Sequence, residues 1–164
     1  MTNDNKKPWY YARTEADLNS VYKMFWGFHD FRVQKIVYLP EKEEIDLYLE
    51  YDSYGIRLLL KFIENVSMNF VPNDDYEADW LSGATIGLNA KKQVVWAADE
   101  DLEVKNLPSY PLWIVGDKFR YALIDESDNP IEIPNTILHQ IHSIYDYEKK
   151  AYVDEKFDYE PKLI

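Results

Sequence analysis

Residues 45–51, Ile-Asp-Leu-Tyr-Leu-Glu-Tyr, decide the fold, because apolar and polar side chains alternate there without a break. A period of two is that of a β-strand, in which successive side chains point to opposite faces. A strand with one buried and one wet face is typical of an antiparallel sheet. The face expected to be buried carries Ile45, Leu47, Leu49 and Tyr51, and the face expected to be wet carries Asp46, Tyr48 and Glu50.

The chain on either side of this strand repeats the pattern. Residues 28–39 alternate before it, and residues 56–70 alternate after it with a break near Glu64-Asn65. Polar turns at 40–43 and 52–55 separate the three segments. Consecutive strands joined by short turns predict an antiparallel meander. The core residues expected from the inward parity are Leu47, Leu49, Leu58, Leu60 and Phe62.

Two helices are expected outside the sheet. Thr14 with Asp17 three residues later is a capping-box pattern, and apolar residues at helical spacing follow it. We expect an amphipathic helix over 15–26 that ends at Gly27. A second helical pattern begins at Pro134-Asn135. The C-terminal helix predicted there, which would dock on the sheet, carries Ile137, Leu138, Ile141, Ile144 and Tyr145.

Length and composition favour one folded domain. The chain has 164 residues, 46% of them hydrophobic, and a chain of that length buries roughly 70% of the surface that it exposes when unfolded. We expect a disordered N-terminus over 1–8 and a single domain over 9–164, with 146–164 either a loosely attached tail or a last strand. The predicted fold class is α+β, mainly antiparallel sheet arranged as a meander, a sandwich or a partly open barrel.

Charge and cysteine content exclude many functions. The formal net charge is −12, so phosphates of nucleic acids and anionic membrane surfaces would repel the protein. The sequence contains no Cys, which excludes disulfides, thiolate nucleophiles and Cys-based metal sites. It also lacks an apolar signal core and any run long enough to span a membrane. We expect a cytoplasmic protein without a cofactor, whose partner, if it has one, is a basic protein.

Motifs that carry chemistry are scarce. No glycine-rich phosphate loop and no nucleophile elbow is found, so the protein is not expected to be an enzyme. His139 and His142 lie three apart on the predicted helix, and whether they bind a metal stays open, although solvent-facing histidines are the simpler interpretation. His29 and Asp30 begin a predicted strand, where neighbouring side chains point apart and would not hydrogen-bond to each other.

One set of patterns carries a resemblance. It consists of His29-Asp30-x-Arg32-Val33-x-x-Ile36, the strand at 45–51 and Leu60-x-Phe62-Ile63-x-x-Val66. Over residues 28–70 the chain resembles small bacterial proteins of uncharacterised function, some of which are grouped with the immunity proteins of polymorphic toxin systems. The resemblance implies a sheet-rich single domain that binds and neutralises a toxin, and it assigns no catalytic residue.

The leading hypothesis is therefore a non-catalytic protein-binding module such as an immunity-type toxin inhibitor. Acidic loops at 72–79 and 99–103 would meet a basic partner, with aromatic anchors between the charges. The alternatives are a small-ligand-binding sheet protein with an aromatic-lined pocket and a hydrolase whose site is not evident. The residues predicted to contact the partner are Asp74, Asp75, Tyr76, Glu77, Asp79, Trp80, Asp99, Glu100 and Asp101.

Overall fold

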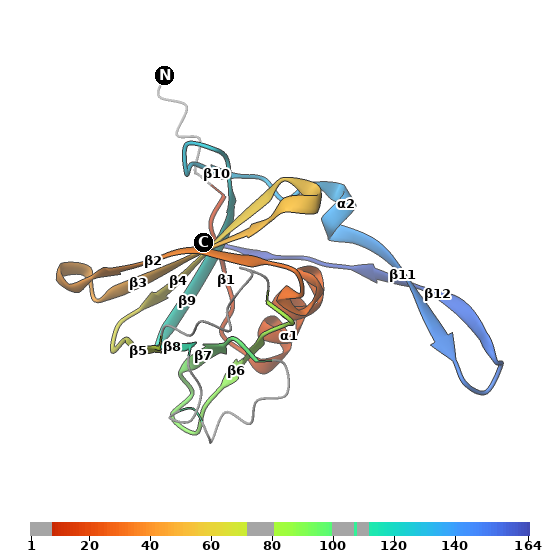
Figure 1. Ribbon diagram of the computed structural model, residues 1–164, viewed down its shortest axis with the longest axis horizontal. Helices are drawn as coiled ribbons and strands as arrows, with labels where there is room; N and C mark the ends of the chain where they lie inside the picture. The colour runs from red at the N-terminus through yellow and green to blue at the C-terminus, as the bar shows by residue number, and fades with distance from the viewer. Residues whose placement is uncertain (1–7, 72–80, 100–106, 108–111) are drawn as a thin grey trace.

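A computed structural model describes residues 8–71, 81–99, 107 and 112–164 of the chain. Its described strands form two open antiparallel sheets and a separate two-stranded ribbon (Figure 1). The larger sheet contains β1 (Tyr10–Tyr11), β2 (Arg32–Leu39), β3 (Glu44–Tyr51), β4 (Ile56–Ile63), β9 (Lys118–Ile124), β10 (Pro130–Ile131) and β13 (Lys162–Leu163). The smaller sheet contains β5 (Ser67–Phe70), β6 (Thr85–Leu88), β7 (Val94–Ala97) and β8 (Leu112–Gly116). The ribbon consists of β11 (His139–Asp146) and β12 (Ala151–Asp158).

The predicted α+β class and the predicted meander are confirmed. The order of the larger sheet is β13-β1-β9-β4-β3-β2, with β10 beside β9, and the order of the smaller sheet is β5-β8-β7-β6. Leu47 pairs with Leu60 and Leu49 with Leu58 across β3 and β4, as the alternation requires. The sheets are open, so the barrel that the sequence left as one alternative is not formed.

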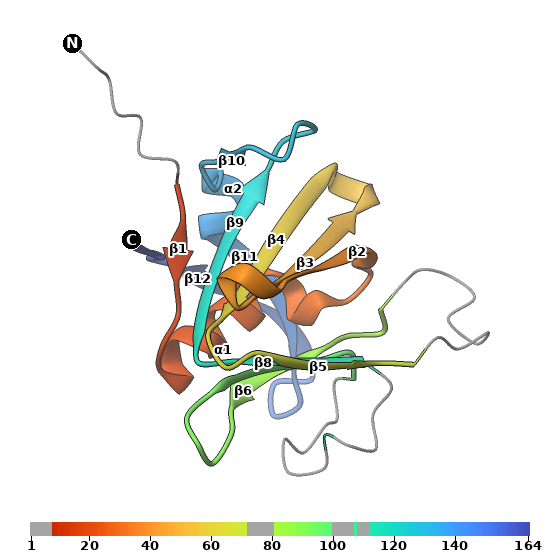
Figure 2. The ribbon, with the colours of Figure 1, turned by 90° about the vertical axis from the view of Figure 1, so that its left-hand side faces the viewer.

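The predicted third strand, 56–70, is two strands that belong to different sheets. Glu64 and Asn65 take φ values of 66° and 47°, and this left-handed corner turns the chain from β4 into β5. The chain returns through a second corner at Gly116, whose backbone approaches β4 closely. A Cβ at Gly116 would lie 3.0 Å from the Cβ of Phe62, so any other residue here would push against β4. Figure 2 shows β5 and β8 leaving the larger sheet side by side.

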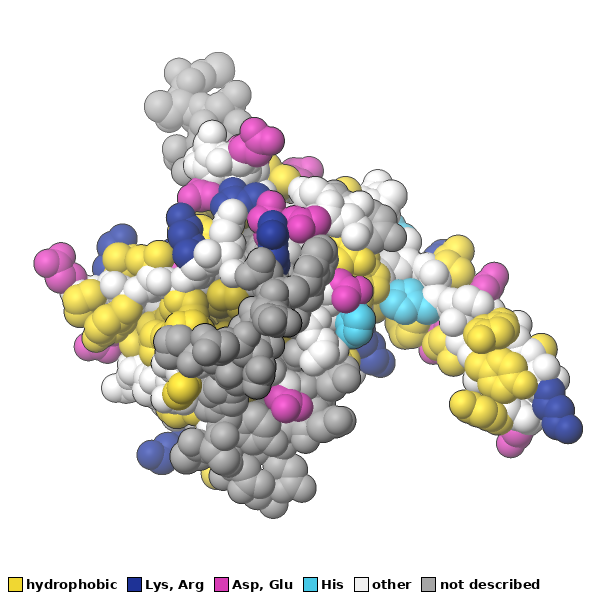
Figure 3. Space-filling view, viewed as in Figure 1, with side chains coloured by type: hydrophobic (Ala, Val, Ile, Leu, Met, Phe, Trp, Pro, Cys, Tyr) yellow, Lys and Arg dark blue, Asp and Glu magenta, His cyan; other side chains and the backbone are white. Residues whose placement is uncertain are grey.

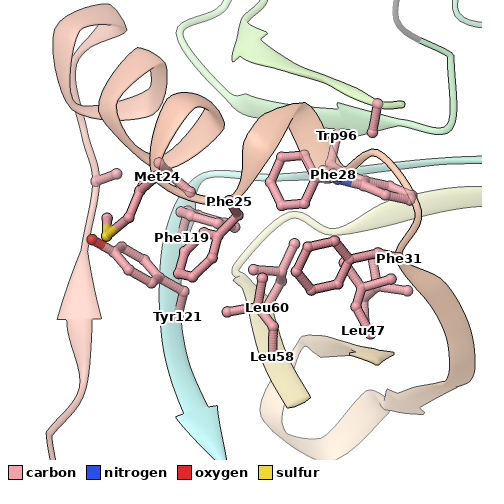
Figure 4. Close-up of a cluster of buried hydrophobic side chains, with 14 of the residues drawn as sticks. Met24, Phe25, Phe28, Phe31, Leu47, Leu58, Leu60, Trp96, Phe119 and Tyr121 are labelled. Atoms are coloured by element: carbon pink, nitrogen blue, oxygen red, sulfur yellow. The ribbon is translucent and has the colours of Figure 1, made fainter. Parts of the chain in front are cut away.

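The core lies between the larger sheet, the smaller sheet and the N-terminal helical segment (Figure 4). All five predicted core residues, Leu47, Leu49, Leu58, Leu60 and Phe62, are fully buried. Three aromatic side chains from the segment between helix and sheet, Phe25, Phe28 and Phe31, pack edge-on with ring centroids 6.2 to 6.5 Å apart. Edge-to-face packing of this kind adds to the free energy of burial.

Helix α1 (Glu15–Met24) begins at the predicted capping box. The Asp17 amide donates to Thr14 Oγ1 at 3.1 Å, and the Thr14 amide donates to Asp17 Oδ2 at 3.2 Å. The helix ends two residues before the predicted end, because Trp26, Gly27 and Phe28 take φ values of 54°, 62° and 58°. A left-handed conformation costs roughly 1–2 kcal/mol for each residue other than glycine. Complete burial of Phe28 offsets part of that cost.

The predicted C-terminal helix is wrong. Helix α2 covers only Asn135–Leu138, and the chain continues directly into β11. The segment after residue 146 supplies β12, the antiparallel partner of β11, and then β13 at the edge of the larger sheet. Pairing with β12 over eight residues satisfies the backbone groups on one side of β11. The sequence pattern alone does not reveal this pairing. Within the described residues, none of the helices is both long and apolar enough to cross a membrane.

Candidate functional site

The acidic loops predicted as a contact surface fall mostly outside the described residues. This applies to Asp74, Asp75, Tyr76, Glu77, Asp79, Trp80, Glu100 and Asp101. Asp99 is described, and its backbone closes the end of β7. Its amide donates to the Ala97 carbonyl at 2.8 Å, and its carbonyl accepts from the Thr85 hydroxyl at 2.5 Å.

His29 and Asp30 do contact each other, contrary to the sequence prediction. His29 Nδ1 lies 2.9 Å from Asp30 Oδ2. The prediction assumed a regular strand, but β2 begins only at Arg32 and Asp30 has a φ of 65°, so the alternation of faces does not apply. Both side chains are more than half exposed. A pair this open to water is a surface contact of small energetic weight.

His139 and His142 lie on the ribbon rather than on a helix. Three residues apart on a strand, they belong to opposite faces, so they cannot share a metal ion. His139 Nδ1 contacts Asp158 Oδ1 at 2.8 Å across the ribbon, and His142 Nε2 contacts Gln140 Oε1 at 2.6 Å. In the described part of the chain, no group of three His, Cys, Asp or Glu side chains is placed to hold a metal ion.

The face of the larger sheet that was expected to be wet carries a closed charge cluster. Lys61 on β4 contacts Glu44 Oε2 at 3.0 Å and Asp46 Oδ2 at 3.1 Å on β3. The Trp9 ring lies over the Lys61 ammonium, with its centroid at 5.2 Å. Asp46 is only 4% exposed as a result, which contradicts its predicted place on a wet face.

This cluster separates the pKa values of its two carboxyl groups. Burial, followed by the neighbouring Glu44, raises the pKa of Asp46 to about 6 despite Lys61. Burial acts in the same direction on Glu44, but hydrogen bonds with Lys61 and Asp46 outweigh it and lower the pKa of Glu44. Paired carboxyl groups with separated pKa values occur in acid–base catalysis. Here Lys61 contacts both groups and Asp46 scarcely reaches solvent, so the arrangement is that of a structural ion cluster.

The β11–β12 ribbon reaches away from the rest of the molecule (Figure 1). Its eight cross-strand pairs run from His139–Asp158 at the root to Asp146–Ala151 at the tip. Asp146 Oδ1 accepts from the amides of Glu148 and Lys149 at 2.9 and 3.1 Å, which closes the tip turn. Among the described strands, neither β11 nor β12 pairs with anything except the other. Both outer edges therefore offer unpaired backbone groups.

Three tyrosines cluster at the distal end of the ribbon, and we refer to Tyr145, Tyr147 and Tyr152 as the tyrosine cluster. The Tyr145 ring lies 4.9 Å from that of Tyr147 and 5.2 Å from that of Tyr152, both edge-on. The three residues are 38%, 84% and 71% exposed, respectively. Figure 3 shows hydrophobic side chains covering this end of the ribbon, with lysine at its tip.

The root of the ribbon is tied to the body by a buried amide. Gln140 Nε2 donates to the backbone carbonyls of Met24 and Ile137, both at 2.8 Å. Phe157, the cross-strand partner of Gln140, stacks on Tyr159 with parallel rings 6.2 Å apart. Support is thus concentrated at the root. Beyond it, Ile141 and Ile144 are exposed along with the tyrosine cluster.

The sequence analysis missed the tyrosine cluster because it divided these residues between a helix and a tail. The available signal was the polar segment Glu148-Lys149-Lys150 with aromatic residues on both sides, which is typical of a hairpin. Comparisons with known proteins add no assignment, since no family model, curated protein or solved structure matches the chain.

Proposed function

We propose that this protein is a non-catalytic protein-binding module whose contact element is the β11–β12 ribbon, and that its partner is a basic protein. The observation that carries the proposal is the exposed tyrosine cluster on a ribbon that leaves the body. Tyrosine is enriched at protein interfaces, since its ring supplies apolar area and its hydroxyl a hydrogen bond. Exposed apolar groups gathered in one place mark interaction sites more often than scattered ones.

The architecture of the ribbon supports the same proposal. An isolated two-stranded hairpin is at best marginally stable in water, and only the root of this one is anchored on buried groups. A partner strand added to either outer edge would satisfy backbone groups and make a three-stranded sheet. The distal half is therefore expected to gain order when it is bound.

Charge decides which kind of partner fits. With a net charge of −12, a second copy of the chain would be repelled, whereas a basic protein would be attracted over long range. The ribbon contributes five carboxylates and three lysines between residues 139 and 158. Inhibition of a basic toxin is the particular form that the resemblance over residues 28–70 implies.

The test compares two tyrosines of the ribbon with one exposed tyrosine outside it. Tagged full-length protein captures its partner from host lysate, and affinity is then measured with the purified partner. Tyr147→Ser with Tyr152→Ser should weaken binding about 30-fold or more if these rings are hot spots. Tyr38→Ser is the matched control, because Tyr38 is 58% exposed on β2, away from the ribbon. A partner that binds the ribbon variant as tightly as the wild type would contradict the proposal.

Salt tests the charge of the partner separately. The Debye length falls from about 30 Å at 0.01 M salt to about 8 Å at 0.15 M. The association rate should therefore fall steeply over this range, whereas the dissociation rate changes little. An association rate indifferent to salt would remove the argument for a basic partner while leaving the role of the ribbon intact.

A further inference from the structure

An aromatic pocket lies where the root of the ribbon meets the end of α1. Its volume is about 340 Å³, within the range of small-molecule sites. Four of its lining residues are aromatic: Tyr22, Trp26, Phe157 and Tyr159. Trp26 stacks on Tyr51 with ring centroids 5.4 Å apart, and Phe157 stacks on Tyr159. His142 also packs edge-on against Phe157, with ring centroids 4.8 Å apart. Trp26, Phe157 and Tyr159 are thus each held by a neighbouring ring.

The backbone beneath the pocket is built to hold these rings. Trp26 belongs to the left-handed turn 26–28, a strained conformation of the kind that clusters at functional sites. Tyr22 covers Gly27 so closely that a Cβ there would lie 2.9 Å from the tyrosine ring. Glycine therefore suits this position in two ways, since it takes a positive φ without strain and leaves room for the Tyr22 ring.

One polar group of the pocket, the His142 ring, is held by a neighbouring side chain. Because Gln140 Nε2 donates to two backbone carbonyls, its Oε1 is the acceptor that faces His142. His142 therefore carries its proton on Nε2, and within the described residues Nδ1 has no partner. The Lys23 ammonium lies 5.6 Å from the centre of the Phe157 ring. It forms no ion pair with a described residue, so a positive charge borders the apolar surface.

We propose that this pocket binds a free small molecule with a planar aromatic ring and an anionic group. The ring would stack against Trp26 and the Phe157–Tyr159 pair, and the anion would lie beside Lys23. An aromatic amine would be disfavoured, because its charge would meet that of Lys23 on the same side of the pocket. The proposal concerns a site distinct from the tyrosine cluster and does not depend on the existence of a protein partner.

The proposed ligand chemistry is tested with three probes that share the indole ring. They are the anion indole-3-acetate, the neutral indole-3-acetamide and the amine tryptamine. Each is titrated into ¹⁵N-labelled full-length protein and followed by the amide of Gly27 and the indole N–H of Trp26. The acetate should give saturable shifts at both positions and bind about twofold to fivefold more tightly than the acetamide, the range for a partly exposed ion pair. Tryptamine should bind most weakly.

Two variants separate the contributions of Lys23 and Trp26 to the binding of the probes. Lys23→Gln, at an exposed position, should equalise the acetate and the acetamide without weakening the acetamide. Trp26→Leu should weaken all three probes, roughly threefold to tenfold for the loss of one stacked ring. Lys35→Gln is the matched control, since Lys35 also lies over an aromatic ring, that of Tyr48 at 4.3 Å, outside the pocket. No saturable shift at the pocket, or equal binding of acetate and tryptamine, would overturn the proposal.

Discussion

The β3–β4 hairpin and the β11–β12 ribbon are built from the same local structure, eight-residue antiparallel strands, yet they occupy opposite environments. One face of β3–β4 is fully buried against α1 and the smaller sheet, and its other face carries the closed Lys61 cluster. The ribbon is anchored at one end and exposed over the rest. From this difference we expect the two hairpins to differ in stability, because a two-stranded ribbon is marginally stable until something covers its faces.

The largest expected effect on stability appears when one apolar side chain is truncated in each of the two regions. Leu49→Ala should lower the free energy of unfolding by about 2–5 kcal/mol, because it empties a core site that cannot fully collapse. Ile144→Ala, on the exposed part of the ribbon, should change it by less than about 0.5 kcal/mol. Urea denaturation measures both. A loss below about 1 kcal/mol for Leu49→Ala would mean that the core does not depend on this face of β3.

The Lys61 cluster should give the next largest effect. Lys61→Met keeps the apolar stem of the side chain but leaves two nearly buried carboxyl groups without a counter-charge. We expect a loss of roughly 1–3 kcal/mol at pH 7.5, and a smaller loss at pH 5, where Asp46 takes up a proton. A variant more stable than the wild type at both pH values would show that the cost of desolvating the cluster exceeds the attraction within it.

The raised pKa of Asp46 predicts how stability depends on pH. The folded-state pKa of about 6 lies above the reference value of 3.8, so between these values the folded state binds the extra proton. The contribution of Asp46 to the free energy of unfolding is therefore fully present below about pH 4 and is lost as pH rises through 6. Glu44, whose pKa is lowered, acts at more acidic pH. Asp46→Asn should flatten the decline in stability between pH 5 and 7, as measured by urea denaturation at each pH. Asp154→Asn on the ribbon should leave that decline unchanged.

The contrast between the regions also explains what the sequence could predict. In β3 the alternation of apolar and polar side chains coincides with burial on one face, so strand, register and core were all predictable. Across α2 and β11, the apolar residues Ile137, Leu138, Ile141, Ile144 and Tyr145 are spaced as on one face of a helix. The helix does begin, at Asn135–Leu138, but pairing with β12 converts the remainder into a strand. That partner follows directly across the tip turn, but the helical spacing gives no sign of it.

The aromatic pocket was less predictable than the fold, because it depends on segments distant in the chain. The aromatic pocket joins Tyr22 and Trp26 to Phe157 and Tyr159, more than 100 residues later. Helical spacing places Tyr22 and Trp26 on an apolar helix face that Gly27 ends, but it does not show that Trp26 and Phe28 are left-handed as well. The aromatic content, 16% of the chain, does not say where the rings lie.

The smallest stability effect is expected at the tyrosine cluster. Tyr147 is 84% exposed, so Tyr147→Ser should leave the midpoint of urea denaturation nearly unchanged, within about 0.5 kcal/mol. The same substitution contributes to the loss of partner binding proposed above. A large loss of binding with little change in stability is the mark of a binding residue rather than a structural one. A large destabilisation by Tyr147→Ser would assign the cluster to the support of the ribbon instead.

Native-state hydrogen exchange most directly tests the central claim that the distal ribbon lacks support until a partner covers it. In the free protein, cross-strand amides beyond Gln140 should exchange through local opening, far faster than those of β4, which should require global unfolding. Addition of the captured partner should slow the ribbon amides and leave β4 unchanged. Ribbon amides as protected as those of β4 in the free protein, or unaffected by the partner, would contradict the account.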